Sequence, residues 1–184
     1  MIRGKRIILR TINPEELDYV YGLISDISSK GPFWHLAIQP LNKFRHEFNE
    51  SGFWSLNEGR MLIMSFDGDY IGEILYFKGL DYQSGFEAGY ELFDGKFAGS
   101  GYMTEALSLF CAYMFAVKPI NRIQVNIMSD NIPSIKVVEK CGFTYEGTMR
   151  QATFHNGQYH DLKLFSILRD DCTSLDSLIK EFGE

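Results

Sequence analysis

The fold is decided by one stretch, residues 85–128, which reads GFEAGYELFDGKFAGSGYMTEALSLFCAYMFAVKPINRIQVNIM. Apolar and polar side chains alternate over residues 85–94, as they do in a strand with one buried face. From residue 101 to 117 apolar residues recur every three or four positions, which predicts a helix that Pro119 ends. Residues 122–128 alternate again. A strand, a helix and a second strand in this order predict two parallel strands joined by a crossover.

Short turns on both sides of this stretch predict hairpins. Asp67-Gly68 separates MLIMSF from YIGEILYF, and Asn156-Gly157 separates residues 143–154 from residues 159–168. The fold class is therefore α/β, with a central mixed sheet that is mostly antiparallel, contains one parallel pair and is flanked by helices. The other expected elements are a strand at 5–11 and helices at 14–29, at 41–50 and from Pro133 to a terminator at Gly142.

The length and composition fit one domain. The chain has 184 residues, of which 45% are hydrophobic and 15% aromatic, enough to bury a core. We expect a single domain over residues 1–184 with its core at about 5–168. Residues 169–184 are typical of a short amphipathic helix that packs on the body or on a partner through Leu175, Leu178, Ile179 and Phe182.

The charge and the scattered reactive residues exclude several classes of protein. A net charge of -6 disfavours nucleic-acid binding and favours a cationic small substrate or a basic peptide. Arg10 interrupts the first apolar run, so we expect no signal peptide, no membrane partner and a cytoplasmic location. Neither a disulfide framework nor a metal site is expected from the spacing of Cys111, Cys141 and Cys172 and of His35, His46, His155 and His160.

A glycine pair lies between the strand at 85–94 and the following helix. Gly99 and Gly101 lack Cβ atoms, so the backbone there can turn its N–H groups inward, and the helix adds unpaired donors and a positive dipole end. This arrangement predicts a phosphate-binding loop, although the glycines could also simply make a turn. No Lys-Ser/Thr pair follows and no third glycine is present, which excludes a P-loop and a dinucleotide fingerprint.

Five segments in order resemble the GNAT acetyltransferase superfamily, in the branch related to bacterial ribosomal-protein N-terminal acetyltransferases. They are GFEAGYEL, AGSGYMTEAL, NRIQV, NIPSIKVVEKCGFTYEGTMR and NGQYHD. The resemblance covers residues 5–168 and is most specific from residue 85 onward. It implies an acetyl-CoA site in a cleft between two splayed parallel strands, those at 85–94 and 122–128.

The resemblance also implies where the cofactor would lie. The pantetheine arm would pair with the backbone of one strand end, the pyrophosphate would rest on the amides of the glycine loop, and two residues of the next helix would contact the cofactor. Two side chains depart from the family pattern: Ala98 replaces Gln or Arg, and the bulky Met103 replaces a small residue. The expected cofactor-binding residues are Leu92, Phe93, Asp94, Ala98, Gly99, Ser100, Gly101, Tyr102, Met103, Thr104, Asn131 and Ser134.

The implied reaction is attack of an amine on the thioester carbonyl. A protonated amine with a pKa near 10 is not a nucleophile at pH 7, so a base is needed. Glu87 falls where the superfamily places a strand glutamate in that role, or it faces solvent or pairs with a basic residue. Val138 replaces the tyrosine that serves many members as the acid. In the resembled branch, the serine at the position of Ser134 serves as this acid. Alternatively, Ser134 is a helix cap or a cofactor contact.

The acceptor pocket is expected from the segment before and after the second helix. Trp34, His35, Phe53 and Trp54 are candidates to contact the substrate, or they form the margin of the core. Thr153 replaces a glutamate of the ribosomal branch, which weakens the case for the same protein substrate. On the same hairpin, Arg150 and Asp161 are expected to pair and fix the register.

Three functions remain open from the sequence. The first is an acetyl-CoA-dependent N-acetyltransferase that acts on a protein N-terminus or on a small amine. The second is a catalytically silent domain that binds acyl-CoA as a sensor or partner surface, and the third is a structural domain whose loop binds nothing. Exposed sheet edges make a homodimer a further expectation.

Overall fold

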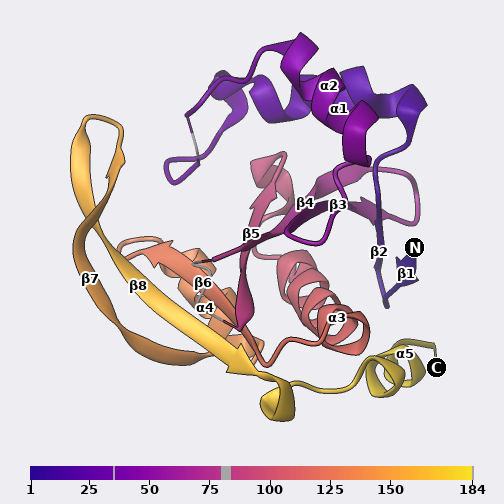
Figure 1. Ribbon diagram of the computed structural model, residues 1–184, viewed down its shortest axis with the longest axis vertical. Coiled ribbons are helices and arrows are strands. Elements are labelled where there is room, and N and C mark those ends of the chain that lie inside the picture. Colours follow the sequence, from indigo (N-terminus) through magenta and orange to yellow (C-terminus); the bar gives the residue numbers. More distant parts are fainter. Residues whose placement is uncertain (35, 80–83, 184) are drawn as a thin grey trace.

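The computed structural model describes residues 1–34, 36–79 and 84–183, and Figure 1 shows their arrangement. One eight-stranded sheet has the order β1-β2-β3-β4-β5-β6-β8-β7, and only β5 and β6 are parallel. The mixed, mostly antiparallel sheet predicted from the sequence is therefore confirmed. The strands are β1 Ile2–Arg3, β2 Ile7–Arg10, β3 Glu58–Ser65, β4 Tyr70–Lys78, β5 Gly85–Leu92, β6 Arg122–Met128, β7 Thr144–His155 and β8 Gln158–Leu168.

Helices cover both faces of the sheet. In Figure 1, α1 and α2 lie on one side of it, and α3 and α4 lie on the other. The first predicted strand is shorter than expected, because only Ile7–Arg10 pair with β3, and the two-residue β1 was not predicted. The helices are α1 Leu17–Ser25, α2 Leu41–Ser51, α3 Tyr102–Val117, α4 Ile132–Lys140 and α5 Leu175–Gly183.

The helix predicted at residues 14–29 is divided into three pieces. A 3-10 turn at Pro14–Glu16 precedes α1, and a second turn at Ile27–Ser29 follows it. Asp26 separates α1 from the second turn because its backbone is extended and its carboxylate accepts a hydrogen bond from the amide of Ser28. Aspartate favours such local hydrogen bonds over continuing a helix.

The larger of two apolar clusters lies between the sheet and α3. Ten residues of α3 are buried, and Phe86 and Ala88 of β5 point into this cluster. The C-terminal helix packs on the same body, because Leu178 is buried in the cluster. A second cluster lies under α1 and α2 and includes Phe44 and Phe93.

Pairing between the two parallel strands is short. Backbone partners join Gly85–Glu87 to Arg122–Gln124, and no pair follows between the described residues of the two strands. Beyond Glu87, β5 stays paired with β4, whereas β6 stays paired with β8 along its whole length. The two strands separate, and main-chain groups that face the opening have no strand partner.

The β7–β8 hairpin bends out of the sheet toward the side of α1 and α2 (Figure 1). The register shifts between Tyr145 and Gly147 and again between Met149 and Thr153, and such irregularities bend a strand. The predicted Asn156-Gly157 turn is confirmed, with both residues at positive φ. Within the part of the chain that the structure describes, no helix is long and apolar enough to cross a membrane.

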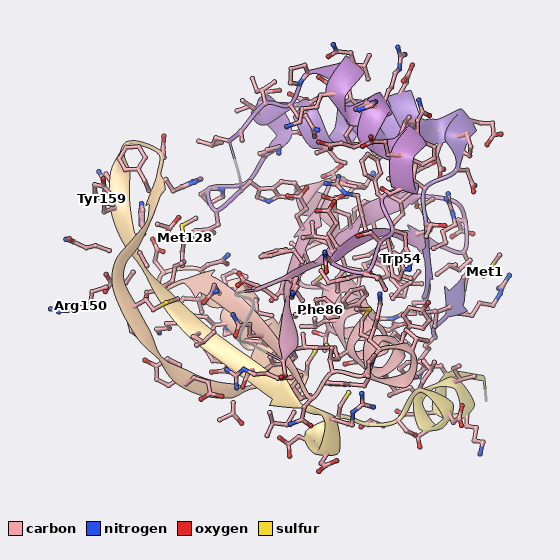
Figure 2. All side chains as sticks on the ribbon, in the orientation of Figure 1. Met1, Trp54, Phe86, Met128, Arg150 and Tyr159 are labelled. Atoms are coloured by element: carbon pink, nitrogen blue, oxygen red, sulfur yellow. The ribbon has the colours of Figure 1, made fainter. Side chains whose placement is uncertain are left out.

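The expected pair of Arg150 and Asp161 does not form. Asp161 instead accepts a hydrogen bond from the backbone amide of Gln151 at 2.8 Å, and Arg150 extends outward from the hairpin (Figure 2). Gln151 has a φ of 50°, inside the second register shift of β7. The bend that turns the amide of Gln151 toward Asp161 could not be deduced from a regular hairpin.

One carboxylate, in the 3-10 turn before α1, joins that turn to β2 and β4. Glu16 accepts hydrogen bonds from both terminal nitrogens of Arg10, from the amide of Asn13 at 2.7 Å and from the hydroxyl of Tyr70 at 2.5 Å. Burial opposes ionisation, but these donors together lower the pKa of Glu16 to about 2. The ionised form is therefore favoured by folding.

We expect Glu16→Gln to lower the free energy of unfolding at pH 7 by about 2 kcal/mol, because charged hydrogen bonds are replaced by weaker neutral ones. The lowered pKa makes this stabilisation complete above pH 5 and lost as the pH falls toward 2. Urea unfolding at pH 7 and pH 3 measures it. A difference between the two proteins that is as large at pH 3 as at pH 7 would contradict the role of the charge.

Candidate active site

Glu87 lies where the parallel pairing ends. It is the last residue of β5 that pairs with β6, and it lies opposite Gln124. Its Oε2 accepts a hydrogen bond from Nδ2 of Asn126 at 2.8 Å and one from Nε2 of Gln124 at 3.3 Å. The side chain therefore neither stands free in solvent nor pairs with a described basic residue. The side-chain carboxamides of Gln124 and Asn126 hold it on the face of the sheet opposite α3.

The backbone at the end of β5 has fewer free main-chain groups for a cofactor than the sequence suggested. The amide of Phe93 donates to the carbonyl of Ile71 at 2.9 Å, so it already has a partner in β4. Main-chain groups alternate in direction along a strand, so those of Leu92 point to the opposite side, where β6 has separated. Asp94 lies beyond the end of β5, and its carbonyl accepts a hydrogen bond from the amide of Phe97 at 3.2 Å. Of the three expected positions, Leu92 alone has main-chain groups that strand geometry directs toward the opening.

The glycine loop has the conformation that an anion site needs. Gly99 and Gly101 have φ values of 73° and 82°, which side chains other than glycine rarely adopt. Within the described parts of the chain, no backbone hydrogen bond is donated by the amides of residues 99–104. Gly101 is the N-cap of α3, so the dipole of a 16-residue helix adds its positive end to these donors. The loop therefore fits a phosphate or pyrophosphate group.

The two departures from the family pattern have different consequences. The side chain of Met103 is buried in the larger apolar cluster, so it points away from the loop and does not crowd it. Ala98 is exposed and contributes no polar group. The bulky residue is accommodated by the core, and the small one leaves the loop with backbone donors alone.

Arg6, which the sequence did not suggest, adds a positive charge beside the loop. Its Nη1 donates to the carbonyl of Ser100 at 2.6 Å, and its guanidinium lies 5.2 Å from the ring centre of Tyr102. Glu105 holds Arg6 by accepting from its backbone amide at 2.9 Å and from its Nε at 3.1 Å. No local pattern could reveal this contact, because the partners are more than ninety residues apart.

Asn131 and Ser134 lie at the start of α4. Asn131 is the N-cap, and its Oδ1 accepts from the amide of Ser134 at 3.2 Å. Ser134 is therefore the capped residue rather than the cap, and its hydroxyl lies 2.7 Å from the hydroxyl of Tyr90 on β5. Burial raises the pKa of Tyr90. Val138, in the position of the missing tyrosine, is fully buried.

The predicted acceptor residues divide between the two faces of the sheet. Trp34 and Phe53 pack against the cluster under α1 and α2, on the face that carries Glu87. Trp54 packs instead against Tyr76 and against Tyr113 of α3, and it lies far from Met128 and Tyr159 in Figure 2. His35 lies outside the described residues.

A groove of about 230 Å³ opens between the tip of the hairpin and the loop after α1. Nε2 of His155 lies 2.8 Å from the carbonyl oxygen of Pro32, which joins the two segments. The groove is on the face that carries Glu87, and sequence reasoning missed it because it depends on the bend of the hairpin. Its lining includes Phe33, Met128, Asp130, His155 and His160.

A pair of carboxyl groups, one buried and one half-buried, lies further along the same face. Glu73 of β4 and Glu91 of β5 are directly opposite in the sheet, and Glu73 forms an ion pair with Arg60 at 3.0 Å. Burial, together with the neighbouring charge of Glu73, raises the pKa of Glu91 to about 9. Glu91 is therefore protonated at neutral pH. The pair became visible only with the register of β4 and β5.

No group of three or more His, Cys, Asp or Glu side chains in the described ranges is arranged to hold a metal ion. The donors that the site does offer are main-chain amides, hydroxyls, carboxamides and Arg6. They suit a phosphate-bearing ligand with a polar arm.

Comparison with known proteins identifies relatives of one kind. The sequence profile described as "Acetyltransferase (GNAT) domain" matches residues 6–144. The SPbeta prophage-derived N-acetyltransferase YokL of Bacillus subtilis is 26% identical over 168 residues, which cover 91% of this chain and 93% of YokL. YdaF of the same organism, named as a candidate ribosomal N-acetyltransferase, is 34% identical over 74 residues, only 40% of each protein.

The fold has close neighbours among solved structures. The crystal structure of spermidine N-acetyltransferase from Vibrio cholerae, in complex with CoA and spermine, superposes with a TM-score of 0.77. The match covers 90% of this chain and 97% of that one at 18% sequence identity, so it establishes a shared fold.

We expect Arg6→Ala to weaken binding of CoA about 10-fold, because the loss of a charged donor beside the loop corresponds to roughly 1.4 kcal/mol. Isothermal titration with CoA measures the dissociation constant. Lys5→Ala, an exposed cation on the adjacent residue, is the matched control. Equal dissociation constants for wild type, Arg6→Ala and Lys5→Ala would show that Arg6 does not support the loop.

We expect the melting temperature of the wild type to fall as the pH rises from 5 to 9, in part because Glu91 binds a proton in the folded protein that the unfolded chain has released. Glu91→Gln removes this contribution, so its melting temperature at pH 9 should exceed that of the wild type by roughly 3 °C. Thermal unfolding at pH 5, 7 and 9 tests this. Glu139→Gln, the same change at an exposed position on α4, should follow the wild type.

Proposed function

The chain belongs to the acetyltransferase (GNAT) domain family, whose members use acetyl-CoA as the acetyl donor, and we propose that it transfers this group to a primary amine by direct attack on the thioester. The observation that carries the proposal is the end of the β5–β6 pairing at Glu87. At this point the carboxylate of Glu87 is held by the side-chain amides of Gln124 and Asn126. The part of β5 that no longer pairs with β6 continues from here toward the glycine loop, whose amides donate no backbone hydrogen bond among the described residues.

The described residues fit each part of the donor. The amides of residues 99–104 would bind the pyrophosphate, with Arg6 beside them. The main chain of Leu92 would pair with the pantetheine arm, as a strand does. Asn131 and Ser134 would contact the donor from α4. When bound, acetyl-CoA supplies the activated carbonyl.

Glu87 would remove a proton from the amine. Gln124 and Asn126 both donate to Oε2, so Oε1 has no hydrogen-bond partner among the described residues. An amine with a pKa near 10 is mostly protonated at pH 7, and a carboxylate within reach lets it attack in its neutral form. The position of Glu87 at the end of the pairing puts this base next to the opening between the strands.

The thiolate that leaves would take its proton near α4. Ser134 and Tyr90 form a hydroxyl pair on the α3 side of the opening, opposite the face of Glu87. A thiol with a pKa near 8.5 is a tolerable leaving group, so the reaction needs little acid catalysis. We assign Ser134 to this step, with Tyr90 as the residue that orients it.

Two acceptor classes fit the groove beside the hairpin, the α-amine of a peptide and a small amine such as a polyamine. The net charge of -6 favours a cationic acceptor of either class. The Vibrio cholerae neighbour was crystallised with spermine, and YdaF is named for a ribosomal substrate. A panel of spermidine, a simple diamine and a short peptide with a free N-terminus separates the two classes.

We expect Glu87→Gln to lower kcat/KM for the acceptor about 10²-fold at pH 7 and to leave the affinity for acetyl-CoA within about twofold, because the base acts on the amine alone. Release of CoA thiol measures the rate, and isothermal titration measures the affinity. Glu139→Gln is the matched control. Binding of acetyl-CoA by the wild type without transfer to any amine of the panel would favour the silent binding domain instead.

A further inference from the structure

Asn126 has a buried oxygen with no partner. It lies two residues beyond Gln124, the last residue of β6 that pairs with β5, and its Nδ2 donates to Glu87. Its Oδ1 is buried and accepts no hydrogen bond from the described parts of the chain. Buried polar atoms nearly always have a hydrogen-bond partner, so an unpartnered oxygen indicates that a donor outside the described chain binds here. Among the described side chains only Ser129 has a comparable atom, its Oγ.

The strands around Asn126 do not supply that partner. Leu164 of β8 is directly opposite Asn126, and its side chain has no donor. Gln124, the next residue on the same face, gives its Nε2–H to Glu87. On the other side β5 has already separated. The free oxygen of Asn126 thus lies buried beside the point where β5 and β6 separate.

Two acceptors flank a single hydrogen bond. The Nδ2 of Asn126 donates to the Oε2 of Glu87. The other oxygen of each side chain, Oδ1 of Asn126 and Oε1 of Glu87, remains available to accept a hydrogen bond from a ligand. A primary ammonium group has three N–H donors and suits two such acceptors. A secondary ammonium group has two N–H donors and loses both when its amide forms, whereas a primary ammonium group keeps one N–H throughout the reaction.

We propose that Asn126 Oδ1 and Glu87 Oε1 together bind the amino group of the acceptor, and that Asn126 selects primary over secondary amines. This inference rests on the proposed function. Glu87 takes one proton from the ammonium, while Asn126 holds a second N–H and fixes the rotation about the C–N bond. As nitrogen bonds to the carbonyl carbon, the C–S bond breaks, and the amine's second lost proton ends on sulfur.

The competing explanation is that Asn126 only orients Glu87. Gln124 offers the matched comparison, because it lies on the same strand and face and donates to the same oxygen of Glu87, but it has no buried atom that lacks a partner. A variant of Gln124 disturbs the orientation of Glu87 alone. A variant of Asn126 disturbs the orientation and also removes the proposed contact with the amine.

The test compares wild type, Asn126→Leu and Gln124→Leu with spermidine, a short peptide and the N-methylated form of each. We expect the wild type to prefer the primary amine about 10²-fold in kcat/KM, since a site built for an N–H rejects an analogue that lacks it. Asn126→Leu should raise the acceptor KM about 10-fold and lower this preference to about 10-fold. Gln124→Leu should lower kcat and leave KM and the preference within about threefold.

Several results would overturn the role of Asn126. The first is a wild type that acetylates primary and N-methylated amines equally well, which needs no variant. The second is equal effects of the two leucine variants, on kcat alone. If Asn126→Leu does not fold, as judged by thermal unfolding, Asn126→Ala removes the same carboxamide without adding bulk, and the same outcomes apply.

Binding separates this inference from the proposed function. Titration of spermidine or the peptide into protein saturated with CoA reports acceptor affinity without turnover. No transfer by the wild type to any primary amine contradicts the proposed function. An acceptor affinity that is unchanged in Asn126→Leu contradicts the role of Asn126, whether or not the wild type turns over.

Discussion

The site depends on a conflict between two sets of strand pairs. β5 continues along β4 and β6 continues along β8, so the parallel pair between them lasts for only three residues on each strand. A longer parallel pair would use up the main-chain groups that now face the opening. Sheets normally pair such groups, and an unpaired stretch in the middle of one requires support from elsewhere.

Side chains provide that support on both faces of the sheet. On the α3 side the hydroxyls of Tyr90 and Ser134 connect β5 to α4, and on the other side Glu87 connects β5 to Asn126 of β6. Each contact spans the opening near the point where backbone pairing stops. The opening is thus held at a fixed width by polar groups, which are also the groups that a donor and an acceptor would meet.

Sequence reasoning predicted what local chemistry controls. The ends of β6, the Asn156-Gly157 turn and the glycine loop before α3 follow from periodicity and from turn-forming residues, and the resemblance added the opening between the strands. Sequence reasoning could not predict contacts that depend on strand register or that join segments far apart in the chain. Arg6 beside Ser100 and Glu73 opposite Glu91 are of this kind. Trp54, a candidate for the acceptor pocket, packs against Tyr113 of α3, and the sequence does not specify this because an aromatic residue next to a strand can turn either way.

The burial of α3 has a consequence for the thermodynamics of any ligand at its first turn. The helix is fixed by the sheet on one side and by α5 on another, and its two loop glycines already have the conformation that directs their amides outward. The conformational entropy of this segment is lost when the chain folds rather than when an anion arrives. A phosphate group therefore binds to main-chain amides that are already ordered, and its binding requires little further ordering of the protein.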